Sequence, residues 1–361
     1  MRIICVCGAR PNFMKIAPIM RELENNTEIT PLLVHTGQHY DEKMSDLFFR
    51  ELGIPEPDIN LGIGSGSHAV QTAEVMKAFE PIILDFKPDF VLVVGDVNST
   101  IACGLVAVKL GVKLIHVEAG LRSGDRSMPE EINRVLTDAI SDLLFVTEQS
   151  GVDNLLAEGV SPEKIHFVGN VMIDTLLANR EKAESSAILE ELNLTKGEYI
   201  VATLHRPSNV DDQYNFKQIL DAFVEIQMDI PIVFPIHPRS RKNIEQMGFS
   251  NLINGAKGIR LIEPVGYLDF MKLLANAAVV MTDSGGIQEE TTILQVPCMT
   301  LRENTERPVT ITEGTNQLVH VTTKDILEKY QALKSKNFVA TTNVPQLWDG
   351  KASERILTVL S

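Results

Sequence analysis

The stretch Phe90-Val91-Leu92-Val93-Val94-Gly95-Asp96 is an unbroken apolar run that ends at a glycine and a carboxylate. A short run that is apolar at every position is typical of a strand buried on both faces of a parallel sheet. A segment of helical length, 101–110, follows it, and a second apolar run lies at 114–117. This order of strand, helix and strand predicts an α/β fold built on a doubly wound parallel sheet.

The same alternation continues along the chain in two sets. Further apolar runs lie at 3–7, 31–35 and 143–146 in the first half, and at 199–203, 232–235, 259–262, 279–282 and 298–301 in the second. The segment 174–196 is polar and rich in Glu and Ala, which indicates a domain junction near 170–195. We therefore expect an N-terminal domain over 1–170, a C-terminal domain over 171–345, and a final helix within 346–361 that packs back on the first domain.

Ligands of doubly wound folds bind outside the carboxyl ends of the strands. Two such sheets with these ends facing each other would form one central cleft between the domains, and we expect the site there.

Composition excludes several classes of partner. The 361 residues carry 33 Lys and Arg against 48 Asp and Glu, a net charge of −15, which argues against binding to nucleic acid or to an anionic membrane. No stretch approaches the roughly 18 to 20 apolar residues of a transmembrane helix. Four cysteines in a chain of this length fit a reducing compartment, and the first apolar run is too short for a signal peptide, so we expect a cytoplasmic protein.

Two carboxylates in the first half follow neighbouring strands. Asp96 comes after the run 90–94, and Glu118 comes after the run 114–117. Either residue alone can be explained by a structural function, and Asp96 could simply cap the next helix. Two carboxylates at the same sheet edge indicate acid–base chemistry more strongly than either one alone. Glu130 and Glu131 then open a helix, where at least one of them serves only the helix dipole.

Positive and small residues gather at strand ends in the second half. His205-Arg206 follows one strand and His237 the next, which gives the local positive charge that a polyanion needs. The segment from Asp283 to Glu290 contains a Ser-Gly-Gly turn that opens a helix, which suits a diphosphate, and Glu290 could bind ribose hydroxyls. The spacings of His116, His205 and His237 match no compact metal motif, so we expect no metal.

The first turn, Gly8-Ala9-Arg10-Pro11-Asn12, also opens a helix. Arg10 and Lys15 could hold a phosphate there, although a plain strand–helix turn with two surface cations explains this motif as well. The turn is not a dinucleotide fingerprint, and the chain contains no nucleophile elbow and no P-loop. We therefore expect no cofactor.

In combination, these motifs resemble the non-hydrolysing UDP-N-acetylglucosamine 2-epimerase family along essentially the whole chain. The motifs that carry the resemblance are Gly8-Ala9-Arg10-Pro11, Thr36-Gly37-Gln38-His39, Gly95-Asp96, His116 to Arg122, Pro129-Glu130-Glu131, His205-Arg206, Asp283 to Glu290, and Asn304 to Pro308. The resemblance implies two Rossmann-like domains in the glycosyltransferase-B architecture, usually as a homodimer. It also implies interconversion of UDP-GlcNAc and UDP-ManNAc without NAD.

The resemblance also assigns residues. Asp96, Glu118 and Glu130 fall on the family's catalytic carboxylates, and His205 falls on its catalytic histidine. The UDP-contacting positions are Arg10, His205, Ser284, Gly285, Gly286 and Glu290, with Lys15 added. Candidates for a second site or for further substrate contacts are Gln38, His39, Arg206, His237 and Arg307.

The chain departs from the family pattern in two places. Some members bind a second, activating UDP-GlcNAc through a second glutamine and an arginine. Here Asp41-Glu42 follows Gln38-His39-Tyr40, and Glu74 stands where the arginine is expected, so obligatory activation is in doubt. Ser208 also replaces an acidic residue that often follows the His-Arg pair.

The expected reaction is inversion at C2 by elimination of UDP to 2-acetamidoglucal and re-addition. Four enzyme or binding alternatives stay open: a 2-epimerase of a UDP-diacetamido sugar or uronate, a hydrolysing 2-epimerase, a glycosyltransferase, and a UDP-sugar-binding module without catalysis.

Overall fold

The computed structural model describes the chain except for residues 9, 38–50, 54–55 and 340–342. It divides into two compact units. The first comprises Met1–Asn179 together with Gln346–Ser361, and the second comprises Arg180–Pro345. Along the chain, the division falls between Asn179 and Arg180.

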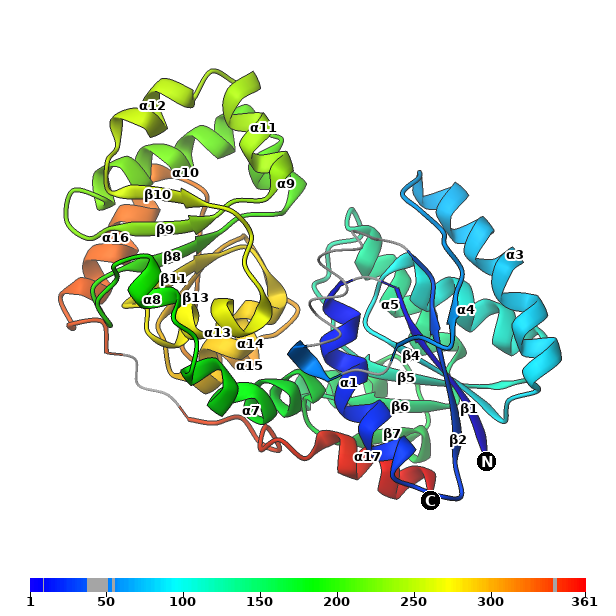
Figure 1. Cartoon of the computed structure of the whole chain (residues 1–361). Helices are drawn as coiled ribbons and strands as arrows, with labels where there is room; N and C mark the ends of the chain where they lie inside the picture. The colour runs from blue at the N-terminus through cyan, green and yellow to red at the C-terminus, as the bar shows by residue number, and fades with distance from the viewer. Residues whose placement is uncertain (9, 38–50, 54–55, 340–342) are drawn as a thin grey trace. The chain divides into compact units, whose positions relative to one another are not determined.

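The described part of the first unit is built on a seven-stranded sheet in the order β3-β2-β1-β4-β5-β6-β7, and every pair of neighbours is parallel. The strands are β1 (Arg2–Cys7), β2 (Thr30–His35), β3 (Ile59–Asn60), β4 (Phe90–Val94), β5 (Lys113–Ala119), β6 (Leu143–Val146) and β7 (Ile165–Phe167). The helices are α1 (Arg10–Glu24), α3 (His68–Phe86), α4 (Asn98–Lys109), α5 (Pro129–Ile140), α6 (Gln149–Ala157), α7 (Val171–Glu184), which contains the unit boundary, and α17 (Ala352–Leu360), with a 3₁₀ turn at Pro162–Lys164. Helices α3, α4 and α5 pack side by side (Figure 1).

The described part of the second unit repeats the plan with a six-stranded parallel sheet in the order β10-β9-β8-β11-β12-β13. Its strands are β8 (Ile200–Thr203), β9 (Ile232–Pro235), β10 (Ile259–Ile262), β11 (Val279–Thr282), β12 (Cys298–Leu301) and β13 (Asn316–Val319). Its helices are α8 (Ile188–Glu191), α9 (Pro207–Val210), α10 (Gln213–Ile226), α11 (Pro238–Gln246), α12 (Ser250–Gly255), α13 (Tyr267–Ala275), α14 (Gly285–Leu294), α15 (Val309–Thr312) and α16 (Thr323–Lys334).

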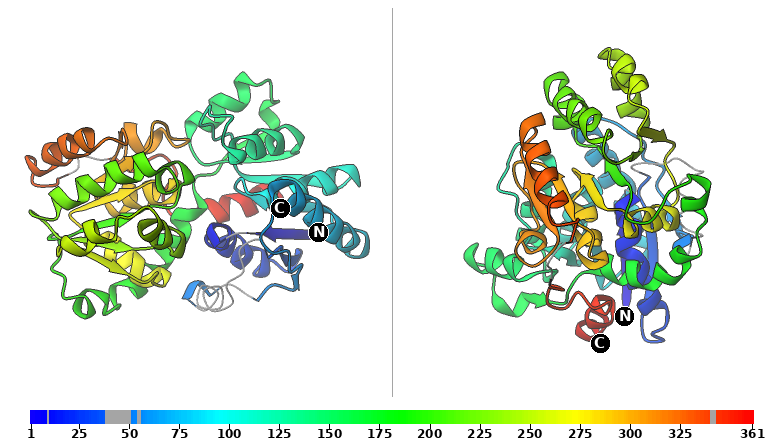
Figure 2. Two further views of the ribbon diagram at one scale, coloured as in Figure 1. Left: turned by 90° about the horizontal axis from the view of Figure 1, so that it is seen from above. Right: turned by 90° about the vertical axis from the view of Figure 1, so that its left-hand side faces the viewer.

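Burial explains why the strands are apolar at consecutive positions. On β8, Ile200 and Ala202 belong to the hydrophobic core on one face of the sheet, whereas Val201 belongs to the core on the other. Helices cover both faces of each sheet, as the views in Figure 2 also show. A side chain on either face of the sheet is therefore removed from water, and the predicted doubly wound α/β fold is confirmed.

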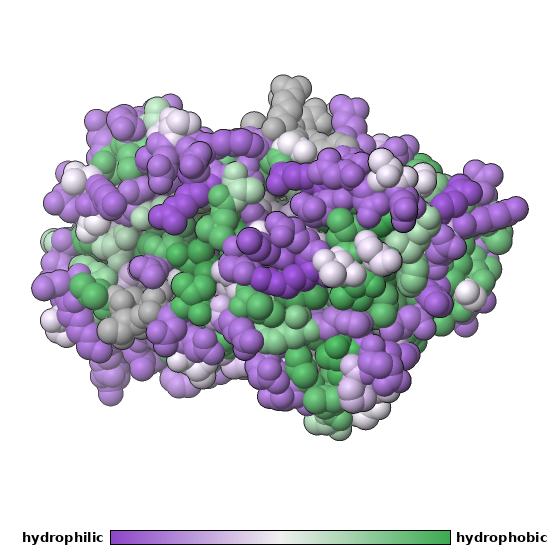
Figure 3. All heavy atoms as spheres, turned by 90° about the horizontal axis from the view of Figure 1, so that it is seen from below, coloured by the Kyte–Doolittle hydropathy of each residue, from purple (hydrophilic) through white to green (hydrophobic). Residues whose placement is uncertain are grey.

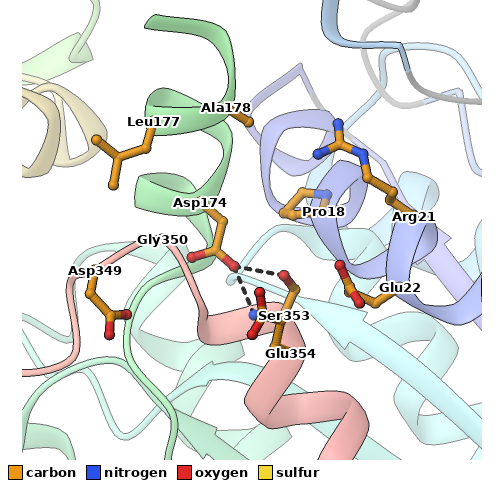
Figure 4. A pocket seen from close by; sticks show the side chains of 10 residues that line it. All are labelled: Pro18, Arg21, Glu22, Asp174, Leu177, Ala178, Asp349, Gly350, Ser353 and Glu354. Carbon is orange, nitrogen blue, oxygen red and sulfur yellow. Dashed lines mark hydrogen bonds between the residues drawn. The ribbon is translucent and has the colours of Figure 1, made fainter.

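The C-terminal segment belongs to the first unit. Helix α17 packs against α1, and the Trp348 indole donates a hydrogen bond to the Thr147 carbonyl at 2.9 Å. Asp174 on α7 caps α17, because its carboxylate accepts from the backbone N–H of Ser353 at 2.7 Å and from the Ser353 hydroxyl at 2.7 Å (Figure 4). These contacts attach Trp348 and the start of α17 to the first unit.

Within the described residues, no helix combines the length and apolar character that crossing a membrane requires. Figure 3 shows one face of the molecule, on which hydrophilic residues are interspersed with smaller hydrophobic areas.

Candidate functional site

Two predicted carboxylates lie at the ends of adjacent strands. Strands β4 and β5 pair in parallel with Val94 opposite Val117, so Asp96 and Glu118 follow paired positions. Glu118 lies within β5 rather than after it. Its φ is +72°, and the register against β6 shifts between Val117 and Ala119, so Glu118 occupies a bulge. A positive φ is costly for a residue other than glycine and persists only where the surroundings enforce it.

Glu118 forms a buried ion pair with Lys15. The Lys15 ammonium contacts Glu118 Oε2, and the two side chains are 9% and 2% exposed. Gly95 permits this approach, because a Cβ at Gly95 would lie 2.8 Å from Lys15 Nζ. Lys15 was predicted as a UDP contact. The structure joins it to a predicted catalytic carboxylate, and the UDP contact stays a prediction.

Asp96 is held by residues of α5. The Arg134 guanidinium pairs with the Asp96 carboxylate, and the Asn133 side chain donates to the Asp96 carbonyl at 2.9 Å. The Asp96 side chain is 27% exposed, so solvent reaches it. Sequence reasoning missed Asn133 and Arg134, although they lie three and four residues after Glu130 and therefore on the same side of α5.

The structure distinguishes the two neighbouring glutamates. Glu131 is buried, and its carboxylate accepts from the N–H groups of Ser123 and Gly124 at 3.0 and 2.9 Å. Burial alone would raise the pKa of Glu131, but these donors and the nearby Arg134 hold it below its ordinary value. Glu131 therefore fixes a loop, whereas the Glu130 side chain is exposed at the start of α5.

In the second unit, Asp283 follows β11 and connects it to the residues that follow the neighbouring strand β8. This buried carboxylate accepts from the backbone N–H groups of His205 and Arg206, both at 3.0 Å, and from the Asn209 side chain at 3.1 Å. The motif containing Asp283 was quoted from the sequence, but its function as a connector was missed. Nothing in the sequence indicates that its partners lie near residue 205.

His205 and His237 are brought together as expected for neighbouring strands. Their ring centroids are 6.1 Å apart in an edge-on arrangement, and the His205 side chain is 50% exposed. His237 also caps α11, because its Nδ1 accepts from the Arg239 N–H at 3.2 Å. The Arg206 Nε donates to the Asp283 carbonyl at 3.0 Å. The side chains of Arg206 and His205 therefore lie beside the turn that begins at Asp283.

Ser284, Gly285 and Gly286 form the start of α14, as predicted. A Cβ at Gly285 would lie 2.5 Å from Arg307 Nη1 and 2.8 Å from Glu306 Oε1, so only glycine fits. Arg307 is buried and pairs with Glu289 at 2.6 Å and with Glu306 at 2.5 Å. These two carboxylates fix Arg307 behind the helix start.

Glu290 is buried on α14, where the Tyr267 hydroxyl donates to its Oε1 at 3.1 Å. Burial raises the pKa of Glu290 to about 7, the neighbouring Glu289 adds to this rise, and the hydrogen bond from Tyr267 opposes it. Tyr267 was missed because it opens a different helix, α13, and shares no motif with Glu290.

Three predicted residues cannot be placed fully. Gln38 and His39 lie outside the described residues, and Arg10 begins α1 with its side chain outside the described part. No group of three or more His, Cys, Asp or Glu side chains in the described part of the chain is arranged to hold a metal ion.

A pocket of about 310 Å³ lies in the first unit between α1, α7 and the start of α17 (Figure 4). None of the predicted site residues lines it. Acidic groups dominate its wall, including Glu22, Asp349 and Glu354, and Arg21 lies beside Glu22 on α1.

Comparisons with known proteins agree with the motifs. A family model described as UDP-N-acetylglucosamine 2-epimerase matches residues 21–361. A UDP-N-acetylglucosamine 2-epimerase of Methanocaldococcus jannaschii is 43% identical over 100% of this chain and 99% of its own. A UDP-2,3-diacetamido-2,3-dideoxy-D-glucuronate 2-epimerase of Pseudomonas aeruginosa is 40% identical over 100% of this chain and 99% of its own.

Solved structures extend the similarity to the fold. The M. jannaschii enzyme in complex with UDP-GlcNAc and UDP matches with a TM-score of 0.92 at 43% identity, covering 100% of this chain and 99% of that one. The Neisseria meningitidis UDP-GlcNAc 2-epimerase bound to UDP-GlcNAc matches with a TM-score of 0.92 at 31% identity and the same coverage. The expected glycosyltransferase-B fold class is thereby confirmed. The match of the family model and the identity along the full chain lead to one conclusion: this protein is a member of the UDP-N-acetylglucosamine 2-epimerase family.

Proposed function

We propose that the protein inverts C2 of UDP-N-acetylglucosamine to give UDP-N-acetylmannosamine, without hydrolysis and without a cofactor. One observation carries the proposal: Asp96 follows β4, Glu118 lies next to the last residue of the neighbouring parallel strand β5, and each is paired with a cation of the first unit. Two carboxylates at one sheet edge are suited to acid–base chemistry on a single carbon.

The chemistry explains why one carboxylate is not enough. The C2 proton of the sugar is not next to a carbonyl and is only weakly acidic. Breaking the C1–O bond to UDP first makes C1 cationic and acidifies C2. Loss of the proton then gives 2-acetamidoglucal and UDP, and inversion requires a proton to return on the opposite face. Groups on both faces of C2 are therefore needed, and Asp96, Glu118 and Glu130 are the candidates.

The second unit would hold the leaving group. His205, Arg206 and the start of α14 at Ser284-Gly285-Gly286 offer positive charge and N–H donors to the diphosphate. Glu290 would bind the ribose hydroxyls. In the first unit, Arg10 remains a proposed diphosphate contact, whereas the pairing of Lys15 with Glu118 favours a function beside the acid–base groups.

The direct test is isotope exchange. UDP-GlcNAc incubated with the protein in D2O should give UDP-ManNAc that carries deuterium at C2, detected by NMR. No exchange and no ManNAc signal would exclude this function for this substrate. Release of free ManNAc as the first product, in a time course, would identify a hydrolysing enzyme instead.

A second substrate is favoured by one observation. The P. aeruginosa relative that acts on a UDP-diacetamidoglucuronate is 40% identical along the whole chain. A panel containing UDP-GlcNAc and that uronate decides between them, because the correct substrate should show the higher kcat/KM. Tight binding of UDP-GlcNAc in a calorimeter, with no turnover of either sugar, would instead identify a binding module.

The carboxylate assignments are tested by Asp96→Asn, Glu118→Gln and Glu130→Gln. Each variant should lose turnover severely while UDP binding survives, because the UDP contacts proposed for the second unit are unchanged. Glu328→Gln, at an exposed position on α16, is the matched control and should keep wild-type rates. Wild-type rates from all three site variants would refute the assignment.

We also propose that the protein works in the cytoplasm, which its few cysteines suit, and that it is a homodimer, as its resemblance to the family implies. Light scattering during size-exclusion chromatography measures the mass directly, and a mass near the 40.0 kDa of one chain would contradict the dimer.

A further inference from the structure

His116 lies at the centre of β5 with no exposed surface, two residues before Glu118 and opposite Val93 of β4. Its Nε2 is 2.9 Å from the Gly95 carbonyl oxygen, and its Nδ1 is 2.6 Å from Asp138 Oδ1 on α5. The Gly95 N–H also donates to the Val117 carbonyl at 3.1 Å. Both sides of the turn before Asp96 are therefore attached to β5.

The partners of the ring determine its protonation. A carbonyl oxygen only accepts hydrogen bonds, so Nε2 must carry a hydrogen. A carboxylate also only accepts, so Nδ1 must carry one as well. A neutral imidazole has one donor and one acceptor, and it cannot satisfy both partners. Unless the Asp138 carboxyl itself holds a proton, His116 is an imidazolium ion.

The surroundings of Asp138 favour the carboxylate. Its second oxygen accepts from the Gly120 N–H at 3.0 Å and from Arg122 Nη1 at 2.7 Å, and both donors stabilise negative charge. The 2.6 Å separation from His116 is also typical of a charge-assisted hydrogen bond.

The Asp138 carboxylate also contacts residues on both sides of the Glu118 bulge. One of its oxygens binds His116, two residues before Glu118, and the other binds the N–H of Gly120, two residues after it. The strained backbone of Glu118, with its φ of +72°, is thus held from both sides by one carboxylate.

We propose that His116 is a positioning residue: a buried imidazolium, held by Asp138, that fixes the turn before Asp96 and the bulge at Glu118 in their catalytic arrangement. This inference rests on the proposed function for its kinetic consequence but not for the protonation of His116. A strand position with no exposed surface is ordinarily apolar, because burying a charge is costly unless it is paired and hydrogen-bonded. A purely structural position would be filled more cheaply by an apolar side chain.

The protonation is tested on the wild-type protein by long-range 15N–1H NMR at pH 7. The expected spectrum shows hydrogens on both ring nitrogens of His116. A neutral ring, with one nitrogen bare, would overturn the proposal. This measurement needs neither substrate nor variant, so its outcome is independent of whether UDP-GlcNAc is the substrate.

The positioning function is tested with His116→Gln and Asp138→Asn. If the proposal holds, kcat falls about a hundredfold, because small displacements of reacting groups are that costly, while KM and the Kd of UDP stay within about threefold of wild type. The backbone amide signals of Gly95, Asp96 and Glu118 should shift in both variants. His166→Gln, on β7 of the same sheet, is the matched control and should leave kcat unchanged.

The outcomes separate the two proposals. Wild-type kcat in both variants, or an equal loss in His166→Gln, would refute positioning by His116. If either variant fails to fold, the wild-type NMR spectrum still decides the protonation. If the wild type shows no exchange at C2, the proposed function fails, whereas the amide shifts in the variants still report whether His116 holds the two carboxylate-bearing segments.

Discussion

The buried pair of Lys15 and Glu118 predicts a stability pattern that isolated charges would not give. Glu118→Gln keeps the size of the side chain but leaves the Lys15 ammonium without its carboxylate, with only 9% of that side chain exposed. Breaking a buried pair from one side costs about 3 to 5 kcal/mol, because the remaining charge is uncompensated. Lys15→Met should cost a similar amount for the opposite charge.

The double variant should be far less destabilised than the sum of the single variants. Removing both charges leaves no uncompensated ion, and replacing a buried pair by neutral groups is often close to neutral in free energy. We therefore expect a coupling energy of at least about 1.5 kcal/mol between the two positions. Glu74→Gln, which removes one member of an exposed pair with Lys77, is the matched control and should cost about 0 to 1 kcal/mol.

The chain supplies its own probe for this measurement. Trp348 is the single tryptophan, it is buried, and it belongs to the first unit, as do Lys15 and Glu118. Its fluorescence in urea titrations therefore reports unfolding of the unit that contains the pair. Additive single variants, or a loss below about 1 kcal/mol for Glu118→Gln, would show that the pair is not formed as described.

Three further predictions concern the second unit. Because the pKa of Glu290 in the folded chain, about 7, lies above its ordinary value of 4.5, the native state holds this proton more tightly. The unfolding free energy should therefore fall by up to about 3 kcal/mol as pH rises through this window, and Glu290→Gln should remove that slope in urea titrations followed by circular dichroism. Gly285→Ala places a methyl group 2.5 Å from the fixed guanidinium of Arg307 and should weaken UDP binding at least about tenfold in calorimetry; unchanged affinity would contradict the fit described. Asp283→Asn removes an acceptor from the backbone of His205 and should lower the unfolding free energy by about 1 to 3 kcal/mol and also lower kcat; a variant with wild-type stability would refute the connector function.

Sequence reasoning succeeded where the periodicity of the fold itself positions side chains. The carboxyl ends of parallel neighbours meet at one edge of a sheet, so one helix and one strand between Asp96 and Glu118 were enough to predict that they lie on adjacent strands. The same rule brought His205 beside His237. These placements depend only on strand order, which the apolar runs indicate.

Sequence reasoning failed where side chains from distant segments meet. The bulge at Glu118, its pairing with Lys15 and the contact of Tyr267 with Glu290 depend on tertiary geometry, and no local pattern encodes them. Sequence could not decide between Glu130 and Glu131 either, because both open a helix and both suit the helix dipole. The burial that separates them comes from the loop at Ser123, which lies beside Glu131 only in the folded chain.

The two ion pairs restrict how the proposed inversion can proceed. Asp96 and Glu118 each contact a cation, an arrangement that suits a group accepting a proton from C2. An ionised carboxylate accepts a proton but has none to give. If the group that removes the C2 proton returned it from the same face, the starting sugar would form again, so inversion needs a second group that is protonated when the intermediate is present. We propose Glu130 for this second group, because its side chain is exposed at the start of α5, where a proton that it gives up can be replaced from water, whereas Glu118 is buried and paired with Lys15. A donor in contact with water explains why the hydrogen at C2 of the product should come from the solvent.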